Sequence, residues 1–127
     1  MVTSTLPDAT DDLLQRSGET DLPETGEQYF LISLRATYNG SEEASALYRD
    51  LIFSAVGASE LEYALFTDFC LFQVPNEIVP FEDISPGGVV EGDICFSVKV
   101  SDAADLLLMV QENGGPAEAR SWMDLRP

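Results

Sequence analysis

Residues 84–100 read ISPGGVVEGDICFSVKV, and this stretch bears on whether the chain binds nucleotides or forms a β-rich fold. Glycine-rich loops bind phosphates when a lysine and a serine or threonine follow the glycines, or when the loop joins a strand to a helix. Here Glu91 and Asp93 accompany the glycines, and both would repel a phosphate. We therefore interpret the stretch as a turn that enters a strand.

The turn and the strand after it each have a recognisable pattern. Pro86 favours a negative φ and Gly87 accepts a positive one, which together indicate a type II turn. Gly88 and Gly92 complete the glycine set of this structural turn, and Gly92 is interpreted as the mark of a bulge. Beyond it, apolar residues alternate with small or polar ones, which is typical of a half-buried strand. The apolar set is Ile94, Phe96, Val98 and Val100.

Other strands are predicted on both sides of this stretch. The strongest pattern is QYFLISLRATY at 28–38, a period of two that ends at the turn dipeptide NG. Two apolar runs joined by GASE at 57–60 indicate a β-hairpin. The remaining predicted strands are 68–74, 106–111 and 121–125, with brief ones at 2–6 and 12–16. For 102–113 the alternative to the strand is a helix capped by Ser101 or Asp102. Residues 41–50 are interpreted as a loop, with a short helix that starts at Ser41 as the alternative.

Length and composition favour a single folded domain. A chain of 127 residues with 45% hydrophobic content buries roughly two-thirds of its surface on folding. Residues 1–27 are expected to be an irregular, turn-rich N-terminal part of that domain. Because short strands alternate with turn signals and no long helix is evident, we predict an all-β fold, an antiparallel β-sandwich.

The charge balance is strongly acidic. Asp and Glu number 23 against 6 Lys and Arg, which gives a formal charge of −17, and Lys99 is the only lysine. No basic run is available to neutralise a nucleic acid backbone or an anionic membrane. The repulsion between like charges favours a soluble monomer. A protein from a salt-adapted organism would show the same composition.

The residue inventory removes most catalytic chemistry. Without histidine, a Ser/His/Asp triad, a Cys/His pair and a histidine-containing zinc site are all excluded. The acidic groups at Asp8, Asp11 and Asp12 and at Glu42 and Glu43 do not have the spacing of a calcium loop. No catalytic, cofactor-binding or metal-binding residue is assigned. A small hydrolase that uses paired carboxylates remains the enzymatic alternative.

The two cysteines, Cys70 and Cys95, lie within predicted strands, opposite their large apolar neighbours. A disulfide between them would close a loop of about 25 residues and contribute about 3 kcal/mol on the chain-entropy model. The alternative is a pair of buried thiols that pack as small hydrophobes. The even count favours the disulfide, which in turn indicates an oxidising compartment. Trp122 is predicted to anchor the core or a lid.

Nothing in the sequence resembles a membrane-spanning segment, because no run of about twenty apolar residues occurs. The N-terminal stretch MVTSTLPDATDD has neither the basic region nor the apolar region of a signal peptide. We therefore expect either a protein that stays inside the cell or a piece of a longer chain.

Five stretches resemble a known family in their order. They are GEQYFLISLRATYNG (26–40), LIFSAV (51–56), DFCLFQVP (68–75), SPGGVVEGDICFSV (85–98) and DAADLLL (102–108). The chain resembles, from about Val2 to Leu125, the exported immunoglobulin-like domains of unknown function in bacterial surface lipoproteins. Their fold is similar to that of a secreted immunogenic mycobacterial antigen.

The resemblance implies an immunoglobulin-like β-sandwich displayed outside the membrane, with Cys70 and Cys95 as the bridging pair. Pro86, Gly87, Gly88 and Gly92 would form the turn before the last strands. No catalytic residue is implied. The chain departs from the family pattern at its start, where it begins with what look like the last residues of the first strand, so that this strand would be incomplete and a sheet edge open.

These observations together predict a non-enzymatic interaction or display domain, extracellular or on the cell surface. It would bind an unidentified protein partner, without a cofactor, and be a monomer or a weak dimer through an open sheet edge. The alternative is an intracellular, cytoplasmic accessory protein of a salt-adapted organism that binds a basic partner through its acidic face.

Overall fold

The fold is described from a computed structural model. The residues that it describes are 2–18, 20–38, 45–46, 51–65, 68, 70, 74–78, 83–112 and 120–126. In chain order the elements are β1 (Val2–Leu6), α1 (Thr10–Ser17), β2 (Glu27–Thr37), β3 (Ser45–Ala46), β4 (Leu51–Val56), β5 (Glu62–Ala64), β6 (Asp83–Ile84), β7 (Val89–Lys99), a 3-10 helix (Ala103–Asp105), β8 (Leu107–Glu112) and β9 (Ser121–Asp124). The described part of the chain is therefore mostly β, as the sequence predicts.

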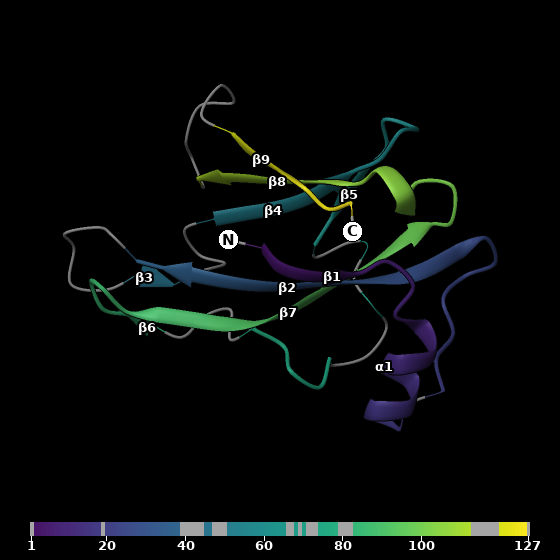
Figure 1. Cartoon of the computed structure of the whole chain (residues 1–127), viewed down its shortest axis with the longest axis horizontal. Helices are drawn as coiled ribbons and strands as arrows, with labels where there is room; N and C mark the ends of the chain where they lie inside the picture. Colours follow the sequence, from purple (N-terminus) through teal and green to yellow (C-terminus); the bar gives the residue numbers. More distant parts are fainter. Residues whose placement is uncertain are drawn as a thin grey trace.

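The strands form antiparallel sheets arranged in layers. One sheet has the order β1-β2-β7, a second has the order β5-β4-β8-β9, and β3 pairs with β6. The pairing of β2 with β7 is the longest and runs without a register shift from Glu27 opposite Lys99 to Thr37 opposite Val89. Figure 1 shows the four-stranded sheet lying over the three-stranded one, with α1 on the far side of the latter.

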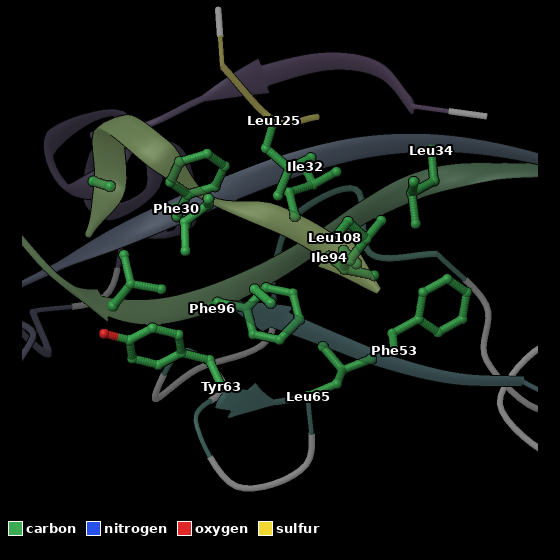
Figure 2. Packing of buried hydrophobic residues seen from close by; sticks show 14 of the residues in the cluster. Phe30, Ile32, Leu34, Phe53, Tyr63, Leu65, Ile94, Phe96, Leu108 and Leu125 are labelled. Carbon is green, nitrogen blue, oxygen red and sulfur yellow. The ribbon is translucent and has the colours of Figure 1, made fainter. Parts of the chain in front are cut away.

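The main core lies between the two larger sheets (Figure 2). The period of two in β2 and β7 directs one set of side chains toward the four-stranded sheet, which contributes its own apolar set. From the three-stranded sheet come Phe30, Ile32, Leu34, Ile94, Phe96 and Val98, and from the four-stranded side come Phe53, Ala55, Tyr63, Leu108 and Leu125. The alternation read from the sequence is thus the alternation that builds this core.

The outer face of the three-stranded sheet is also covered, which corrects the expectation of half-buried strands. Tyr29, Leu31 and Cys95 point away from the main core but are buried in a second cluster. Leu13 of α1 is part of this cluster, together with Ala9, Cys70 and Val74. A helix and a non-strand segment therefore cover a face that the pattern assigned to solvent.

The helix α1 replaces the brief strand predicted at 12–16, which was wrong. Acidic residues Asp11 and Asp12 lie in its first turn and Arg16 in its last, which complements the helix dipole. The helix ends at Gly18, whose N–H donates to the carbonyl oxygen of Leu14. A single apolar residue on the inner side, Leu13, is enough to dock so short a helix onto the sheet.

Most of the other predicted elements are confirmed. The hairpin is β4 with β5, and the strands predicted at 106–111 and 121–125 are β8 and β9. Gly87 has a φ of 82°, and the N–H of Gly88 donates to the carbonyl oxygen of Ser85 at 2.8 Å, which is the expected turn. The strand β7 ends at Lys99, so Val100 lies in the next turn and is exposed.

Two predictions fall on segments that the structure describes only in part. Within 68–74, the described residues Asp68, Cys70 and Val74 belong to no strand, so the strand predicted there is wrong at these positions. Within 41–50, Ser45–Ala46 forms β3, and the rest of the predicted loop lies outside the described residues.

Gly92 is neither part of a turn nor the mark of a bulge, contrary to the sequence interpretation. It lies inside β7, directly opposite Leu34 in an unbroken register. A Cβ added at Gly92 would lie 2.5 Å from the Cα of Ile78 and 2.6 Å from its backbone nitrogen. Glycine is needed here because the chain at 76–78 runs against β7.

Replacing Gly92 with alanine is expected to lower the free energy of unfolding by about 1 to 3 kcal/mol, because backbone atoms must move apart. The matched change Gly87→Ala adds a Cβ in open space and strains only a positive φ, which costs about 1 kcal/mol. Urea unfolding of both variants measures the difference. An equal loss in the two variants would show that the close approach of Ile78 is not needed.

Candidate functional site

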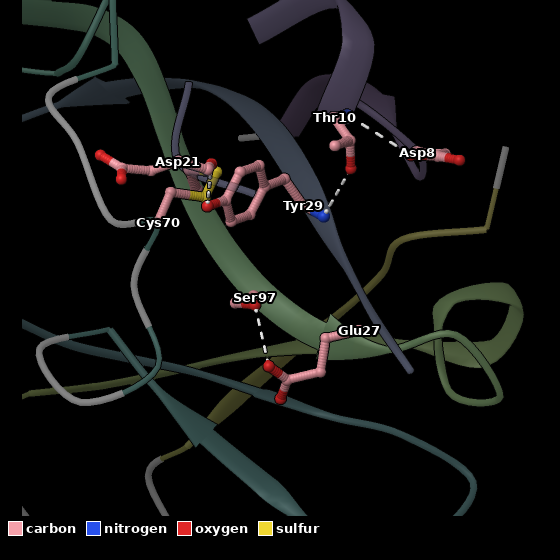
Figure 3. Close-up of a disulfide and its surroundings, with 8 residues drawn as sticks. Asp8, Thr10, Asp21, Glu27, Tyr29, Cys70 and Ser97 are labelled. Carbon is pink, nitrogen blue, oxygen red and sulfur yellow. Dashed lines mark hydrogen bonds between the residues drawn. A yellow bond between two sulfur atoms is a disulfide. The ribbon is translucent and has the colours of Figure 1, made fainter. Parts of the chain in front are cut away.

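A disulfide joins Cys70 to Cys95 on the outer side of the three-stranded sheet (Figure 3). Both cysteines are almost fully buried, within the second apolar cluster. Cys95 is therefore on the face of β7 opposite Ile94 and Phe96, as the sequence indicates, whereas Cys70 is outside any strand. The bridge tethers a non-strand segment to the centre of β7.

That segment follows the edge of β7 that β2 does not use. The N–H of Ser97 donates to the carbonyl oxygen of Asp68 at 2.7 Å. Further along β7, the N–H of Asp93 donates to the backbone carbonyl oxygen of Asn76 at 2.8 Å. The N–H of Ile78 donates to the backbone carbonyl oxygen of Asp93 at 3.0 Å. Because these bonds occupy backbone groups of an edge strand, the tethered segment protects β7 from pairing with another chain.

Tyr29 ties the N-terminal region to the same face of the sheet (Figure 3). Its hydroxyl donates to the carbonyl oxygen of Asp21 at 2.7 Å, and its backbone N–H donates to Oγ1 of Thr10 at 3.2 Å. Figure 3 also shows the hydroxyl of Ser97 directed to Glu27, at 3.3 Å. These contacts hold α1 and its neighbours in place and bring no reactive group to the surface.

Asp102 is a buried carboxylate at one end of the two sheets. Its side chain is about 1% exposed and accepts three hydrogen bonds. The donors are the N–H of Ser59 at 3.0 Å, the hydroxyl of Ser59 at 2.6 Å and the hydroxyl of Tyr63 at 2.6 Å. The N–H of Lys99 in turn donates to the Tyr63 hydroxyl at 3.2 Å. The network therefore connects the β4–β5 hairpin to the end of β7.

The electrostatics of this network suit a structural role. Burial opposes ionisation of Asp102, but the hydrogen bonds from Ser59 and Tyr63 outweigh it, so the pKa of Asp102 lies below its usual value. Burial, and then the hydrogen bond to Asp102, raise the pKa of Tyr63 to about 12. A carboxylate of low pKa is a weak base, and it does not activate the Ser59 hydroxyl as a nucleophile.

The raised pKa of Tyr63 predicts a loss of stability at high pH. The unfolded chain loses this proton near pH 10.0, whereas the folded chain keeps it until about pH 12, so stability present below pH 10.0 is lost between the two values. The loss is at most about 3 kcal/mol. Tyr63→Phe removes this contribution. Urea unfolding between these pH values should show that the difference in free energy of unfolding between wild type and variant becomes smaller as pH rises. A difference that stays constant would contradict the assignment.

A polar groove lies on the outer face of the three-stranded sheet, beside the disulfide cluster. It encloses about 300 Å³ and is lined by Thr3, Ser33, Leu34, Arg35, Asn76, Glu91, Gly92 and Asp93. In the register of β2 and β7, Ser33 is opposite Asp93 and Arg35 is opposite Glu91. Two cross-strand polar pairs therefore form its floor and its rim.

The two pairs differ in burial. Asp93 is about 5% exposed, and its Oδ1 accepts a hydrogen bond from the Ser33 hydroxyl at 2.6 Å. Arg35 and Glu91 form an ion pair of 3.3 Å in which both side chains are more than half exposed. The groove thus has a buried carboxylate at its floor and a solvated, neutral pair at its rim.

The outer face of the four-stranded sheet carries exposed apolar side chains. Ile52 of β4, Leu107 of β8 and Trp122 of β9 are 43%, 39% and 51% exposed. Trp122 is opposite Met109 in the register and alternates with Met123, which packs on the main core. Trp122 therefore lies on the outer face, and the prediction that it anchors the core is wrong.

Sequence reasoning located the disulfide and the turn but missed both buried carboxylates. The sequence pattern presents Asp93 only as a group that repels phosphate, and Asp102 only as the cap of the alternative helix at 102–113. The available signal for Asp93 was its position on the Cys95 side of a strongly apolar strand. Of the acidic groups weighed as calcium ligands, Asp12 pairs with Arg16 at 2.9 Å and Oδ1 of Asp8 accepts from the N–H of Thr10, while Glu42 and Glu43 lie outside the described residues.

Comparison with protein-family models, with curated proteins and with solved structures found no match to this chain. Among the described residues, no helix has the length and apolar character needed to cross a membrane. The described Cys, Asp and Glu side chains form no group of three or more that could hold a metal ion.

Proposed function

We propose that the chain is a non-enzymatic interaction or display domain, extracellular or at the cell surface, with an immunoglobulin-like β-sandwich fold. The observation that carries this proposal is the buried Cys70–Cys95 disulfide. Structural disulfides persist in oxidising compartments and are rare in the cytosol. Here the bond tethers the segment that protects the edge of β7, so it serves the fold and not a redox cycle.

The outer face of the four-stranded sheet supports the interaction role. Trp122 is 51% exposed on this face, and tryptophan is enriched among the interface residues that contribute most binding energy. Trp122 is on β9, which is an edge strand in the order β5-β4-β8-β9. Arg120 and Arg126 flank this strand, and Arg126 is paired with Asp124 of the strand itself.

The test is the redox state and location of the protein in its native host. Non-reducing mass spectrometry after alkylation is expected to find Cys70 and Cys95 joined, in protein recovered from the cell surface or the medium. Two alkylated thiols in protein recovered from the cytosol would overturn the proposal. Surface labelling of intact cells gives an independent readout of location.

A second candidate is favoured by the distribution of charge. Three of the few cations are already paired with carboxylates: Arg16 with Asp12, Arg35 with Glu91 and Arg126 with Asp124. With 23 Asp and Glu against 6 Lys and Arg, the chain carries far more acids than these cations can neutralise, as expected of an acidic accessory protein from a salt-adapted organism. Thermal melting at low and high salt separates the two candidates, because indifference to salt would count against this one.

A further inference from the structure

We propose that the polar groove lined by Ser33, Arg35, Glu91 and Asp93 binds an organic cation, an ammonium or guanidinium group that donates hydrogen bonds to Asp93. This proposal is independent of the cellular location proposed above. It rests on the burial and hydrogen bonding of Asp93, on the charge of the groove and on its volume.

Asp93 has the burial and the partial hydrogen bonding expected of a carboxylate that binds a ligand. The side chain is nine-tenths buried, and Ser33 donates to its Oδ1. Within the described residues, Oδ2 of Asp93 accepts no hydrogen bond, and no fully buried side-chain oxygen there lacks a partner. Oδ2 is therefore accessible, and the space that it reaches is the groove that Asp93 lines.

Asp102, which is also a buried carboxylate, has the hydrogen bonding expected of a purely structural group. Asp102 receives three hydrogen bonds, and both of its oxygens are used. Asp93 receives one, although it is buried to a similar extent. A buried carboxylate is stable when donors or a cation satisfy it, so the free oxygen of Asp93 is suited to a donor supplied from outside.

The charge of the groove selects for a cation. Among the described residues that line the groove, Arg35 and Glu91 at the rim offset each other in charge, and the carboxylate of Asp93 carries the remaining negative charge. Thr3, Ser33 and Asn76 add hydroxyl and amide oxygens that accept further hydrogen bonds. A volume of about 300 Å³ is much larger than a metal ion requires and is at the lower limit of pockets for small organic ligands.

The test is a titration of the full oxidised chain followed by amide NMR shifts at an ionic strength of about 0.15 M. The probes are ethylguanidinium, n-butylammonium and a capped Ala-Arg-Ala peptide. Tetramethylammonium is the matched control, because it carries the charge but has no N–H to donate, and calcium chloride is a second control. Saturable shifts centred on Ser33, Arg35 and Asp93 are expected with the donor-bearing probes alone.

The probes also distinguish two sources of the ammonium or guanidinium group, a protein side chain and a free small molecule. If the peptide binds at least as tightly as ethylguanidinium, the ligand is a basic side chain of a protein partner. If the small ions bind and the peptide does not, the ligand is a free amine or guanidine. Either result supports the proposed recognition by Asp93.

Three variants make the assignment specific. Asp93→Asn is expected to weaken binding by about tenfold or more, whereas Asp11→Asn, which removes an exposed carboxylate on α1, should change it by less than about twofold. Arg35→Ala frees Glu91 and is expected to tighten binding by about two- to fivefold, a gain that misfolding cannot imitate.

The proposal is overturned by any of three results. Tetramethylammonium or calcium could produce the same shifts as the donor-bearing probes, Asp93→Asn and Asp11→Asn could weaken binding equally, or Arg35→Ala could leave affinity unchanged or lower it. Each would show that the acidic surface attracts cations without a defined site.

Discussion

Replacing Asp102 with alanine is expected to lower the free energy of unfolding by about 3 to 4 kcal/mol, the largest loss among the variants considered. Three donors would lose their acceptor, and the Tyr63 hydroxyl and the Ser59 N–H would remain buried or partly buried without it. Hydrogen bonds to a charged group contribute more than neutral ones, so the loss exceeds that of an ordinary polar truncation.

Two further variants isolate the cause. Asp102→Asn keeps the shape and one acceptor oxygen, so about 1 to 2 kcal/mol should be lost. Asp105→Ala removes an exposed carboxylate from the same 3-10 helix and should stay within about 0.5 kcal/mol of wild type. Urea unfolding at neutral pH measures all three. If the free energy of unfolding of Asp102→Ala is no lower than that of Asp105→Ala, the network does not hold this end of the two sheets together.

The network also predicts acid sensitivity. Because the folded-state pKa of Asp102 is below its unfolded value, its contribution is present above the unfolded pKa and is lost as pH falls through the folded one. In Asp102→Asn that part of the acid-induced loss should disappear, which the same unfolding experiment at low pH can measure.

Replacing both cysteines with alanine is expected to cost about 3 kcal/mol and to lower the Tm by roughly 10 °C. The bond closes a loop with a sequence separation of 25, and its loss enlarges the unfolded ensemble. It also releases the segment that covers the edge of β7, so the variant should aggregate more readily than wild type. Calorimetry and light scattering measure the two effects.

The control for this prediction is chemical reduction. A reductant should destabilise the wild-type chain to about the level of the double variant and should leave the double variant unchanged. If reduced wild type melts at the same temperature as oxidised wild type, the bond contributes nothing to the fold. Alanine is the better replacement here because a buried serine hydroxyl would add a cost of its own.

The β-rich fold was largely predictable because its two longest strands have a clear sequence pattern. In β2 and β7 every second residue from Phe30 to Leu34 and from Ile94 to Val98 is apolar, which indicates a sheet with a packed face. The turn at Pro86 and Gly87 was predictable for a local reason, since the φ angle required there is specific to few residues. Both signals are contained within a few adjacent residues.

The features that were missed depend on residues far apart in the chain. Leu13 and Leu14 are two leucines in a short polar run, and only the burial of Leu13 in the cluster with Tyr29 and Cys70 reveals a docked helix. Gly92 looks like a bulge until Ile78 is found against it. The pairing of Ser33 with Asp93 likewise joins distant residues, so no local pattern marks the groove.

The register of the two longest strands also determines when the domain can form. Glu27 pairs with Lys99 and Thr37 with Val89, so the ribosome adds each pairing partner of β2 long after β2 itself. At roughly 5 to 20 residues per second on the ribosome, the delay between the synthesis of β2 and that of β7 is on the order of several seconds. Sheets with such high contact order fold in about milliseconds to seconds once complete. Synthesis therefore sets the earliest moment at which β2 and β7 can pair.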